Sequence, residues 1–360
     1  MTEFDEWLSQ GPYALTREDK RSALLQRLQK LTRHHQQHCT AYRNILHGLG
    51  SNTDDFTAIE DIPFLPVSLF KSLELKSVSD EDIVKTMTSS GTTGQSVSRI
   101  FLDKTTAARQ QKTLVKIVSH FTGMGRLPML IIDTPAVMKD RSMFSARGAG
   151  ILGFSIFGSD RCYALNEDMT LDYEGVKAFL VRHQDKPVLL FGFTFMVWQH
   201  FYQGLYASGQ TLDLANGILI HGGGWKKLQS QAVSADAFAE ALHSVSGLTR
   251  IFDYYGMVEQ TGSVYMQCEH GHFHASIFSD VIIRDPLDFS ACPPGKPGIV
   301  QVLSTLPESY PGHSLLTEDE GILLGEDDCS CGRAGKYFRI LGRLKNAEIR
   351  GCSDTYAAEF

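Results

Sequence analysis

A run of small and hydroxyl-bearing residues, Thr88-Ser-Ser-Gly-Thr-Thr-Gly94, is the segment of this sequence best suited to bind an anion. Glycines and small side chains let successive backbone N–H groups turn toward a phosphate, and the hydroxyl groups add donors. Such clusters are also common in flexible loops, so the segment alone leaves that interpretation open. It is neither a Walker A loop nor a dinucleotide fingerprint. The residues predicted to hold phosphate are Thr88, Ser89, Ser90, Gly91, Thr92, Thr93 and Gly94.

Three later segments supply what a nucleotide needs besides a phosphate loop. His221-Gly-Gly-Gly-Trp-Lys226 follows an apolar run and offers bare backbone against which a flat ring can lie. Asp253-Tyr-Tyr-Gly-Met-Val-Glu259 provides an aromatic face, a glycine and a carboxylate able to hold magnesium. Asp319 offers a carboxylate for ribose hydroxyls, and Arg343 offers a guanidinium for phosphate. The predicted contacts to ATP and Mg2+ are Gly222, Gly223, Gly224, Tyr255, Gly256, Glu259, Asp319 and Arg343.

The order of these segments resembles the adenylate-forming superfamily, which includes acyl-CoA synthetases, luciferases and peptide-synthetase adenylation domains. Residues 88–94 match its phosphate loop, and Tyr255-Gly256-x-x-Glu259 matches its aromatic-Gly-x-x-Glu motif. Asp319 matches its ribose-binding aspartate, and Arg343 matches its Gly-Arg arginine. Within the superfamily, the sequence is most similar to the phenylacetate-CoA ligase group. More narrowly, it resembles the acyl-protein synthetases of the bacterial bioluminescence fatty-acid reductase complex, through Ile62-Pro-Phe-Leu-Pro-Val-Ser-Leu-Phe-Lys71, Asp328-Cys-Ser-Cys-Gly-Arg333 and Ile349-Arg-Gly-Cys-Ser353.

Two features depart from the superfamily's pattern. The phosphate loop continues as Gln95-Ser-Val-Ser98, without the lysine that commonly follows it. The chain also stops soon after Gly351, whereas the superfamily's C-terminal domain continues for roughly another 80 to 100 residues. That domain normally brings the adenylation lysine and the surface that admits coenzyme A. We therefore expect an adenylate-forming N-terminal domain with a truncated C-terminal domain.

Cys352 is predicted to take the acyl group in a second half-reaction. A thiolate is the usual nucleophile for an acyl-adenylate, because it attacks well and leaves a reactive thioester. In acyl-protein synthetases a cysteine close to the C-terminus carries the acyl group, and Cys352 matches it in position and in its Arg-Gly-Cys-Ser context. Arg350 would favour the thiolate, whereas Asp354 and Glu359 oppose this effect. An inert cysteine near the chain end is the alternative.

A second group of thiols and imidazoles predicts a structural zinc site. Cys268-Glu-His-Gly-His-Phe-His274 and Cys329-Ser-Cys331 lie on either side of a β-rich segment, and three thiolates with one imidazole satisfy tetrahedral zinc. The phenylacetate-CoA ligase group has a cysteine, five residues and a histidine, followed later by Cys-x-Cys. This resemblance selects His274 over His270 and His272. Unligated cysteines in a core are the alternative. The predicted zinc ligands are Cys268, His274, Cys329 and Cys331.

The elements that must position these residues indicate an α/β fold with covered sheets. Leucines at helical spacing predict an amphipathic helix within residues 18–49. On it, His34 and His38 with Cys39 are interpreted as a solvated face rather than as metal ligands. Other predicted helices cover 103–121, 172–184 and 228–244, and predicted strands cover 127–133, 187–191, 217–221 and 298–303.

The predicted organisation is one adenylate-forming domain over residues 1–342, followed by a tail over residues 343–360 that carries Cys352. Within the domain, residues from about 262 to 342 are dense in Gly, Pro and short strands, which predicts a smaller β-rich, zinc-binding part.

Composition and charge are ordinary for a soluble globular protein. The chain has 360 residues, of which 42% are hydrophobic and 21% charged. A net charge of -7 with scattered basic residues argues against a nucleic-acid partner. The acidic start does not look like a secretory signal, and the longest apolar run, 188–198, is shorter than the roughly 20 residues of a spanning helix. We therefore expect a cytoplasmic protein whose seven cysteines do not form a disulfide framework.

Together these features predict an acid–thiol ligase. A long-chain fatty acid, or another apolar acid, would react with ATP to give acyl-AMP, and Cys352 would take the acyl group for delivery to a partner acyl reductase. A related ligase using coenzyme A or a carrier protein is one alternative. A non-catalytic assembly subunit is another, and the intact nucleotide motifs argue against it. Residues that would line a tunnel for the acid, or else fill the core, are Phe191, Phe193, Phe195, Met196 and Trp198.

Overall fold

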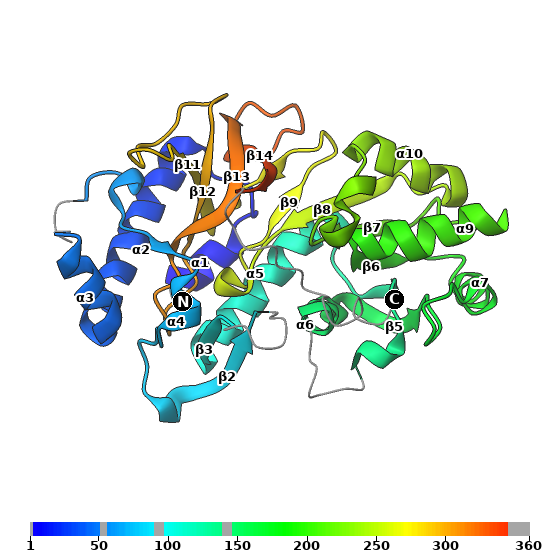
Figure 1. Cartoon of the computed structure of the whole chain (residues 1–360), viewed down its shortest axis with the longest axis horizontal. Helices are drawn as coiled ribbons and strands as arrows, with labels where there is room; N and C mark the ends of the chain where they lie inside the picture. The colour runs from blue at the N-terminus through cyan, green and yellow to red at the C-terminus, as the bar shows by residue number, and fades with distance from the viewer. Residues whose placement is uncertain (1–2, 51–55, 90–96, 139–145, 345–360) are drawn as a thin grey trace. The chain divides into compact units, whose positions relative to one another are not determined.

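A computed structural model describes residues 3–50, 56–89, 97–138 and 146–344 of the chain (Figure 1). The chain divides into two compact units, and each is described by itself. Of the described residues, unit 1 contains 3–50, 56–89, 97–120 and 256–344, and unit 2 contains 121–138 and 146–255. Each unit combines a sheet with helices, which confirms the predicted α/β class.

Unit 2 is built on a parallel sheet with the strand order β8, β7, β6, β4, β5. All residues of β6 and β7 are buried, as expected for a parallel sheet that helices cover on both faces. The predicted strands at 127–133, 187–191 and 217–221 are therefore confirmed. The strands are β4 (Leu127–Ile131), β5 (Gly158–Tyr163), β6 (Leu189–Phe193), β7 (Ile218–Gly222) and β8 (Arg250–Tyr255).

Two helices of unit 2, α7 and α10, begin at side chains that cap them. Asp172 accepts a hydrogen bond from the Gly175 amide at the start of α7 (Tyr173–Arg182), which confirms the predicted helix at 172–184. Ser234 caps α10 (Ala235–Ser246) in the same way, so the helix predicted from 228 begins later, after a separate 3-10 segment. Figure 1 shows α7, α9 and α10 alongside the strands. The remaining helices are α6 (Ala146–Phe154), α8 (Thr194–Met196) and α9 (Gln203–Ser208).

Unit 1 contains the predicted β-rich part as an antiparallel sheet in the order β11, β12, β13, β14, β10, β9. The short strand β1 (Leu65–Pro66) pairs with β13 in parallel, and β2 (Ile83–Thr88) forms a separate hairpin with β3 (Arg99–Asp103). The strand predicted at 298–303 is β12. The other bounds are β9 (Tyr265–Gln267), β10 (Phe273–His274), β11 (Ser279–Arg284), β12 (Pro297–Ser304), β13 (Ser314–Glu326) and β14 (Lys336–Arg343).

The helical region predicted within 18–49 is two helices rather than one. The break falls at Cys39, whose backbone is extended (φ -119°, ψ 104°) and whose side chain is buried. It lets the second helix bury its own apolar side chains, Tyr42 and Leu46. The apolar face predicted from the leucine spacing is confirmed by the burial of Leu24 and Leu28. The helices of unit 1 are α1 (Glu3–Ser9), α2 (Arg17–His38), α3 (Thr40–Gly48), α4 (Leu69–Ser72) and α5 (Lys104–Thr122), the last matching the prediction at 103–121.

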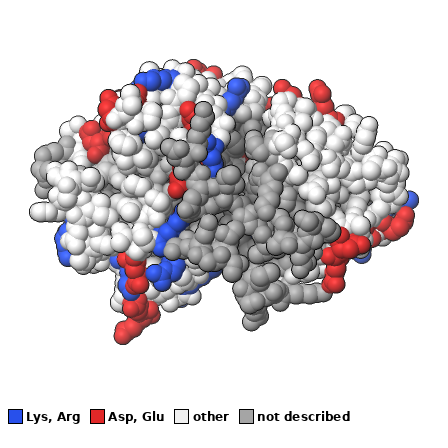
Figure 2. All heavy atoms as spheres, viewed as in Figure 1, with Lys and Arg blue, Asp and Glu red and all other residues white. Residues whose placement is uncertain are grey.

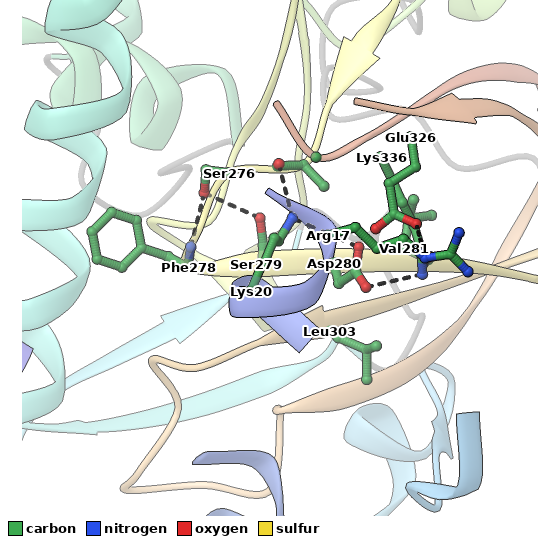
Figure 3. Close-up of polar contacts among 12 residues, drawn as sticks. Arg17, Lys20, Ser276, Phe278, Ser279, Asp280, Val281, Leu303, Glu326 and Lys336 are labelled. Carbon is green, nitrogen blue, oxygen red and sulfur yellow. Dashed lines mark hydrogen bonds and ion pairs between the residues drawn. The ribbon is translucent and has the colours of Figure 1, made fainter. Parts of the chain in front are cut away.

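A buried charge network joins α2 to the sheet of unit 1 (Figure 3). Asp280 on β11 lies 3.8 Å from Nζ of Lys20 on α2 and 2.9 Å from Nζ of Lys336 on β14. All three side chains are almost completely buried. Lys20 also donates to the Ala275 carbonyl at 3.0 Å. Because lysines are seldom fully buried without a partner, this shared carboxylate fixes where α2 docks.

Candidate functional site

The carboxyl edge of the parallel sheet in unit 2 holds several of the residues predicted to contact the nucleotide. Gly222 ends β7, and Tyr255 ends β8. Gly223 and Gly224 follow with left-handed backbone (φ 82° and 66°), which favours glycine. A Cβ on Gly223 would lie 2.7 Å from the Phe193 ring, so this backbone must stay bare. Ligands of open α/β sheets bind outside the carboxyl ends of the strands, which is where these glycines lie.

Sequence reasoning missed a polar group beside these glycines. Thr194 Oγ1 lies 2.9 Å from His221 Nδ1 and donates to the Gly222 carbonyl at 3.1 Å. Because the hydroxyl has one proton, His221 Nδ1 must be the donor in the first contact. Asp253 Oδ1 lies 3.7 Å from the same nitrogen. Burial lowers the pKa of His221 to about 3 and raises the pKa of Asp253 to about 7.

The signal that could have found this group is strand register. His221 and Asp253 occupy paired positions on the neighbouring strands β7 and β8. Both residues stand inside the motifs already singled out, but only the pairing of the strands brings their side chains together. The sequence of either strand alone does not predict which residue of the other strand it will pair with.

A buried ion pair lies at the same edge of unit 2 and was also missed. Arg147 Nε is 2.9 Å from Asp133 Oδ2, and both side chains are buried. Burial raises the pKa of Asp133 to about 6, opposed by Arg147 and by the Thr134 amide. The pair shows that this edge of the sheet can hold charge away from water.

The aromatic side chains of β6 and of the segment after it support the core interpretation rather than the tunnel. Phe191 and Phe193 are buried, and Met196 is completely buried. Phe191 stacks on Phe154 with ring centroids 4.4 Å apart. Trp198 is half-buried and stacks on Phe238 at 5.8 Å. These side chains therefore fill space between α6, α10 and the sheet.

In unit 1 the start of the predicted phosphate loop is tied to Ser98, which lies just beyond the predicted end of the loop at Gly94. Thr88 is the last residue of β2. The Ser89 amide donates to the Ser98 carbonyl at 3.1 Å, and the Ser98 amide donates to Ser89 Oγ at 2.9 Å. The loop between them thus starts and ends at one place, as an anion-binding turn requires. The predicted residues Ser90, Gly91, Thr92, Thr93 and Gly94 lie outside the described residues.

Glu259 is buried on a 3-10 turn, Val258–Gln260, that follows Gly256. Burial raises the pKa of the Glu259 carboxyl, and the Ser98 hydroxyl opposes this rise. Ser98 is itself completely buried. Glu318 also raises the pKa of Glu259, and Arg343 lowers it. The base of the phosphate loop and the predicted magnesium ligand therefore lie close together in unit 1.

Asp319 and Arg343 face each other on neighbouring strands. The register of β13 and β14 pairs them, and Arg343 Nε lies 3.8 Å from Asp319 Oδ1. Arg343 is partly exposed, with 43% of its side-chain surface accessible, so its guanidinium can reach an incoming phosphate. Glu318 was not singled out from the sequence, and its carboxylate lies 4.0 Å from the same guanidinium.

The four residues predicted as zinc ligands converge in unit 1. One donor atom from each of Cys268, His274, Cys329 and Cys331 lies within 4.8 Å of the others. His274 Nε2 is 3.3 Å from Cys331 Sγ. Ligand atoms around tetrahedral zinc are separated by roughly 3.5 to 3.8 Å, so a small closure of the cluster would fit the ion. His272, the competing histidine, has Nδ1 3.4 Å from Cys329 Sγ.

Two tight turns hold the thiols in place. The Gly271 amide donates to the Cys268 carbonyl, and the Gly332 amide donates to the Cys329 carbonyl, each at 2.9 Å. Both glycines have left-handed backbone (φ 74° and 77°). An ion pair of 2.7 Å between Arg333 and Glu269 joins the two turns.

The charge balance of the cluster also suits a cation. Burial raises the pKa of Cys268 and Cys329. Burial acts in the same direction on Cys331, but hydrogen bonds from Arg333 outweigh it and lower the pKa of that thiol. Three thiols and an imidazole this close could hold a divalent ion, which would favour deprotonation of the thiols against the effect of burial.

The other possible metal group has a structural explanation. His34 Nε2 bonds the Glu308 carbonyl at 3.0 Å, and His38 Nδ1 bonds the His34 carbonyl at 2.8 Å. Both nitrogens therefore donate to carbonyls. His38 is exposed, as predicted for a solvated face, whereas Cys39 is buried. Cys352 and Arg350 lie outside the described residues.

Comparison with known proteins identifies the family. The sequence matches the model of the family described as "Acyl-protein synthetase, LuxE" over residues 2–360. The chain belongs to this acyl-protein synthetase family. Membership confirms the predicted resemblance and the assignment to the acid–thiol ligases.

Two relatives of the family are named long-chain-fatty-acid–luciferin-component ligase. The one from Vibrio harveyi is 24% identical over 325 residues, covering 87% of this chain and 81% of the relative. The one from Aliivibrio fischeri is 22% identical over 311 residues, covering 84% of this chain and 79% of the relative.

Solved structures support the predicted fold. An open conformation of 2-hydroxyisobutyryl-CoA ligase is similar with a TM-score of 0.67 and 15% identity, covering 92% of this chain and 76% of that chain. At this identity the likeness concerns the fold alone, and it confirms the adenylate-forming architecture.

Two further observations concern the described residues. Among the described residues no helix has the length and apolar character needed to cross a membrane. On the face shown in Figure 2, basic and acidic side chains of the described residues occur in small mixed groups, in line with the scattered charges of the sequence.

Proposed function

We propose that the chain activates a long-chain fatty acid with ATP as acyl-AMP and then transfers the acyl group to its own Cys352. The observation that carries the adenylation step is the grouping of Glu259, Asp319 and Arg343 beside the closed base of the phosphate loop. The family and the names of its two relatives support the fatty acid as substrate.

ATP would be held by the residues that the motifs predict. Residues 88–94 would bind its phosphates, Gly222 to Gly224 and Tyr255 would receive the adenine ring beside Gly256, and Asp319 would bind the ribose. Glu259 would hold Mg2+, which neutralises charge on the phosphates as pyrophosphate leaves. Arg343 would bind the phosphate that remains in acyl-AMP.

Thioester formation needs only the thiolate of Cys352. Its sulfur would attack the acyl carbonyl, a C–S bond would form, and the bond from that carbon to the phosphate oxygen would break. The electron pair would leave on AMP, and the thiol proton would go to solvent. Delivery of the acyl group to a partner acyl reductase would follow.

A structural Zn2+ is proposed at Cys268, His274, Cys329 and Cys331, where all four coordination positions would be occupied by protein. We also propose the cytoplasm as the compartment.

Replacing Glu259 by Gln tests the adenylation step. The variant should lose fatty-acid-dependent ATP–pyrophosphate exchange, because the amide cannot supply the charge that holds magnesium. Glu174→Gln on the exposed face of α7 is the control and should exchange normally. Normal exchange by Glu259→Gln would overturn the assignment of this carboxylate.

Replacing Cys352 by Ser separates the two half-reactions. Wild type given ATP and a fatty acid should gain the mass of one acyl group, and neutral hydroxylamine should remove it. Cys352→Ser should still form acyl-AMP without gaining this mass, because a serine hydroxyl is far less ionised. Cys162→Ser is the matched control. Full labelling of Cys352→Ser would contradict the acyl-carrier role of this cysteine. Coenzyme A-dependent thioester formation by the same variant would favour a ligase that uses an external thiol.

A further inference from the structure

The carboxylate of Glu259 can hold a metal only if the turn that carries it is fixed, and a chain of buried hydrogen bonds does this in unit 1. We propose that Tyr310 is a positioning residue for Glu259, at the centre of a relay from Gln110 through the tyrosine hydroxyl to the Glu259 backbone. The inference rests on the proposed function, because it concerns the same magnesium site.

The relay has a defined direction. Gln110 Nε2 on α5 donates to the Tyr310 hydroxyl at 3.2 Å, and that hydroxyl donates to the Glu259 carbonyl at 2.9 Å. Tyr310 is completely buried, and Gln110 is 3% exposed. Because the amide can only donate through Nε2, the single hydroxyl proton is directed to Glu259. No water is needed to complete the chain.

The loop that carries Tyr310 also holds the next residue of the turn. Gln260 Nε2 donates to the Gly312 carbonyl at 2.8 Å and to the Val302 carbonyl at 3.1 Å. The turn is closed on its own side by Thr261, whose hydroxyl donates to the Val258 carbonyl at 3.0 Å. The 3-10 turn is therefore anchored at successive residues, and the Glu259 carboxylate leaves it from a fixed Cα.

Two glycines show how closely these segments approach. A Cβ on Gly312 would lie 2.8 Å from the Glu259 carbonyl oxygen. A Cβ on Gly262 would lie 2.6 Å from the Gln110 carbonyl oxygen, and its backbone is left-handed (φ 91°). Only glycine lets α5, the turn and the Tyr310 loop meet at these distances.

Loss of the relay should weaken Mg2+ binding more than it impairs folding. Mg2+ requires oxygen ligands at about 2.0 to 2.1 Å in near-ideal octahedral geometry, so a small shift of the turn weakens its binding. Loss of the tyrosine hydroxyl leaves the Glu259 carbonyl buried without its donor, and the turn can relax toward another one. The Gln110 and Tyr310 side chains themselves need not touch ATP.

Tyr310→Phe should raise the Mg2+ concentration for half-maximal pyrophosphate exchange by roughly 5- to 10-fold, the scale of one buried hydrogen bond. Tyr265→Phe is the matched control. Tyr265 is 2% exposed and donates its hydroxyl to the Asp280 carbonyl at 2.8 Å, so its loss should lower stability similarly. Its Mg2+ requirement should stay within about twofold of wild type.

Gln110→Leu is the second variant and decides the question if Tyr310→Phe does not fold. It keeps the tyrosine but removes the donor that orients its hydroxyl, so it should raise the Mg2+ requirement in the same direction and by less. If Tyr310→Phe needs no more Mg2+ than the control Tyr265→Phe, the positioning role is wrong, but the proposed function stands. Gln110→Leu takes the place of Tyr310→Phe in this comparison if the latter does not fold. Absence of exchange in wild type with any fatty acid would overturn the proposed function and this inference with it.

Discussion

Lowering the pH from about 7.5 to about 5 should weaken unit 1 through two stacked histidines in its core. His35 of α2 and His313, just before β13, are at most 1% exposed, and their ring centroids lie 5.0 Å apart. Among the described residues, their ring nitrogens form hydrogen bonds with uncharged groups, such as Ser77 for His35 and Thr32 for His313. Burial lowers the pKa of both, to about 3 for His313, and the nearby Arg27 adds to the effect.

The sign follows from which state binds protons. In the unfolded chain a histidine titrates near pH 6.5, whereas His313 stays neutral in the folded protein down to about pH 3. Between these values the unfolded state binds more protons, so the free energy of unfolding falls as the pH falls. Over the stated interval His313 should contribute a loss of about 2 kcal/mol. His35 should add to this loss in the same direction, because burial also lowers its pKa well below the usual value.

Urea unfolding followed by circular dichroism at the two pH values measures this loss. His313→Gln removes one titrating group, and its amide can still bond the Thr32 hydroxyl. The pH-dependent loss of stability in this variant should be smaller than in wild type by about 2 kcal/mol. Gln37→Ala, at an exposed position of α2 and without a titrating side chain, should leave the pH-dependent loss unchanged.

The quantity compared is the change in the free energy of unfolding between the two pH values. A destabilisation that is the same at both pH values therefore does not affect the comparison. If His313→Gln loses as much stability as wild type between the two pH values, the buried histidine pair is not the source of the acid sensitivity. The reasoning from burial to protonation would then be wrong for this core.

Other consequences concern the charge network and the zinc site. Asp280→Asn should lower the free energy of unfolding by about 3 to 5 kcal/mol, because it leaves Lys20 and Lys336 buried without their shared carboxylate. Urea unfolding measures this, and a loss below about 1 kcal/mol would contradict it. Metal analysis should find about one zinc ion per chain, and Cys329→Ser or chelation should lower the melting temperature rather than only the activity. Metal-free native protein in which Cys329→Ser melts like wild type would remove the site.

Local pattern was enough to predict which segments are suited to chemistry. Composition alone indicates the Gly, Ser and Thr run at 88–94 and the Gly-rich turn at 222–224. Bare backbone and side-chain hydroxyl groups are suited to binding an anion or a flat ring. The strands of unit 2 were equally visible, since strands covered on both faces are continuously apolar. For the zinc ligands, residue types and spacing indicated the site, and family resemblance chose His274 among three histidines.

Local pattern did not reveal the break between α2 and α3 or the division into two units. The break at Cys39 lies in a segment whose residues all tolerate a helix, and burial of Tyr42 and Leu46 by the second helix accounts for it. The division into two units was also not apparent, because unit 1 is assembled from both ends of the sequence.

The sequence by itself determined which residue types are available for binding a nucleotide and a metal, since those types and their short-range spacing are written in the chain. Only the tertiary structure decided which side chains meet. Gln110 and Tyr310 are 200 residues apart, and His221 meets Asp253 only through strand pairing. Such contacts form because packing and strand register bring distant segments within hydrogen-bond distance, and no local propensity of either segment encodes the other.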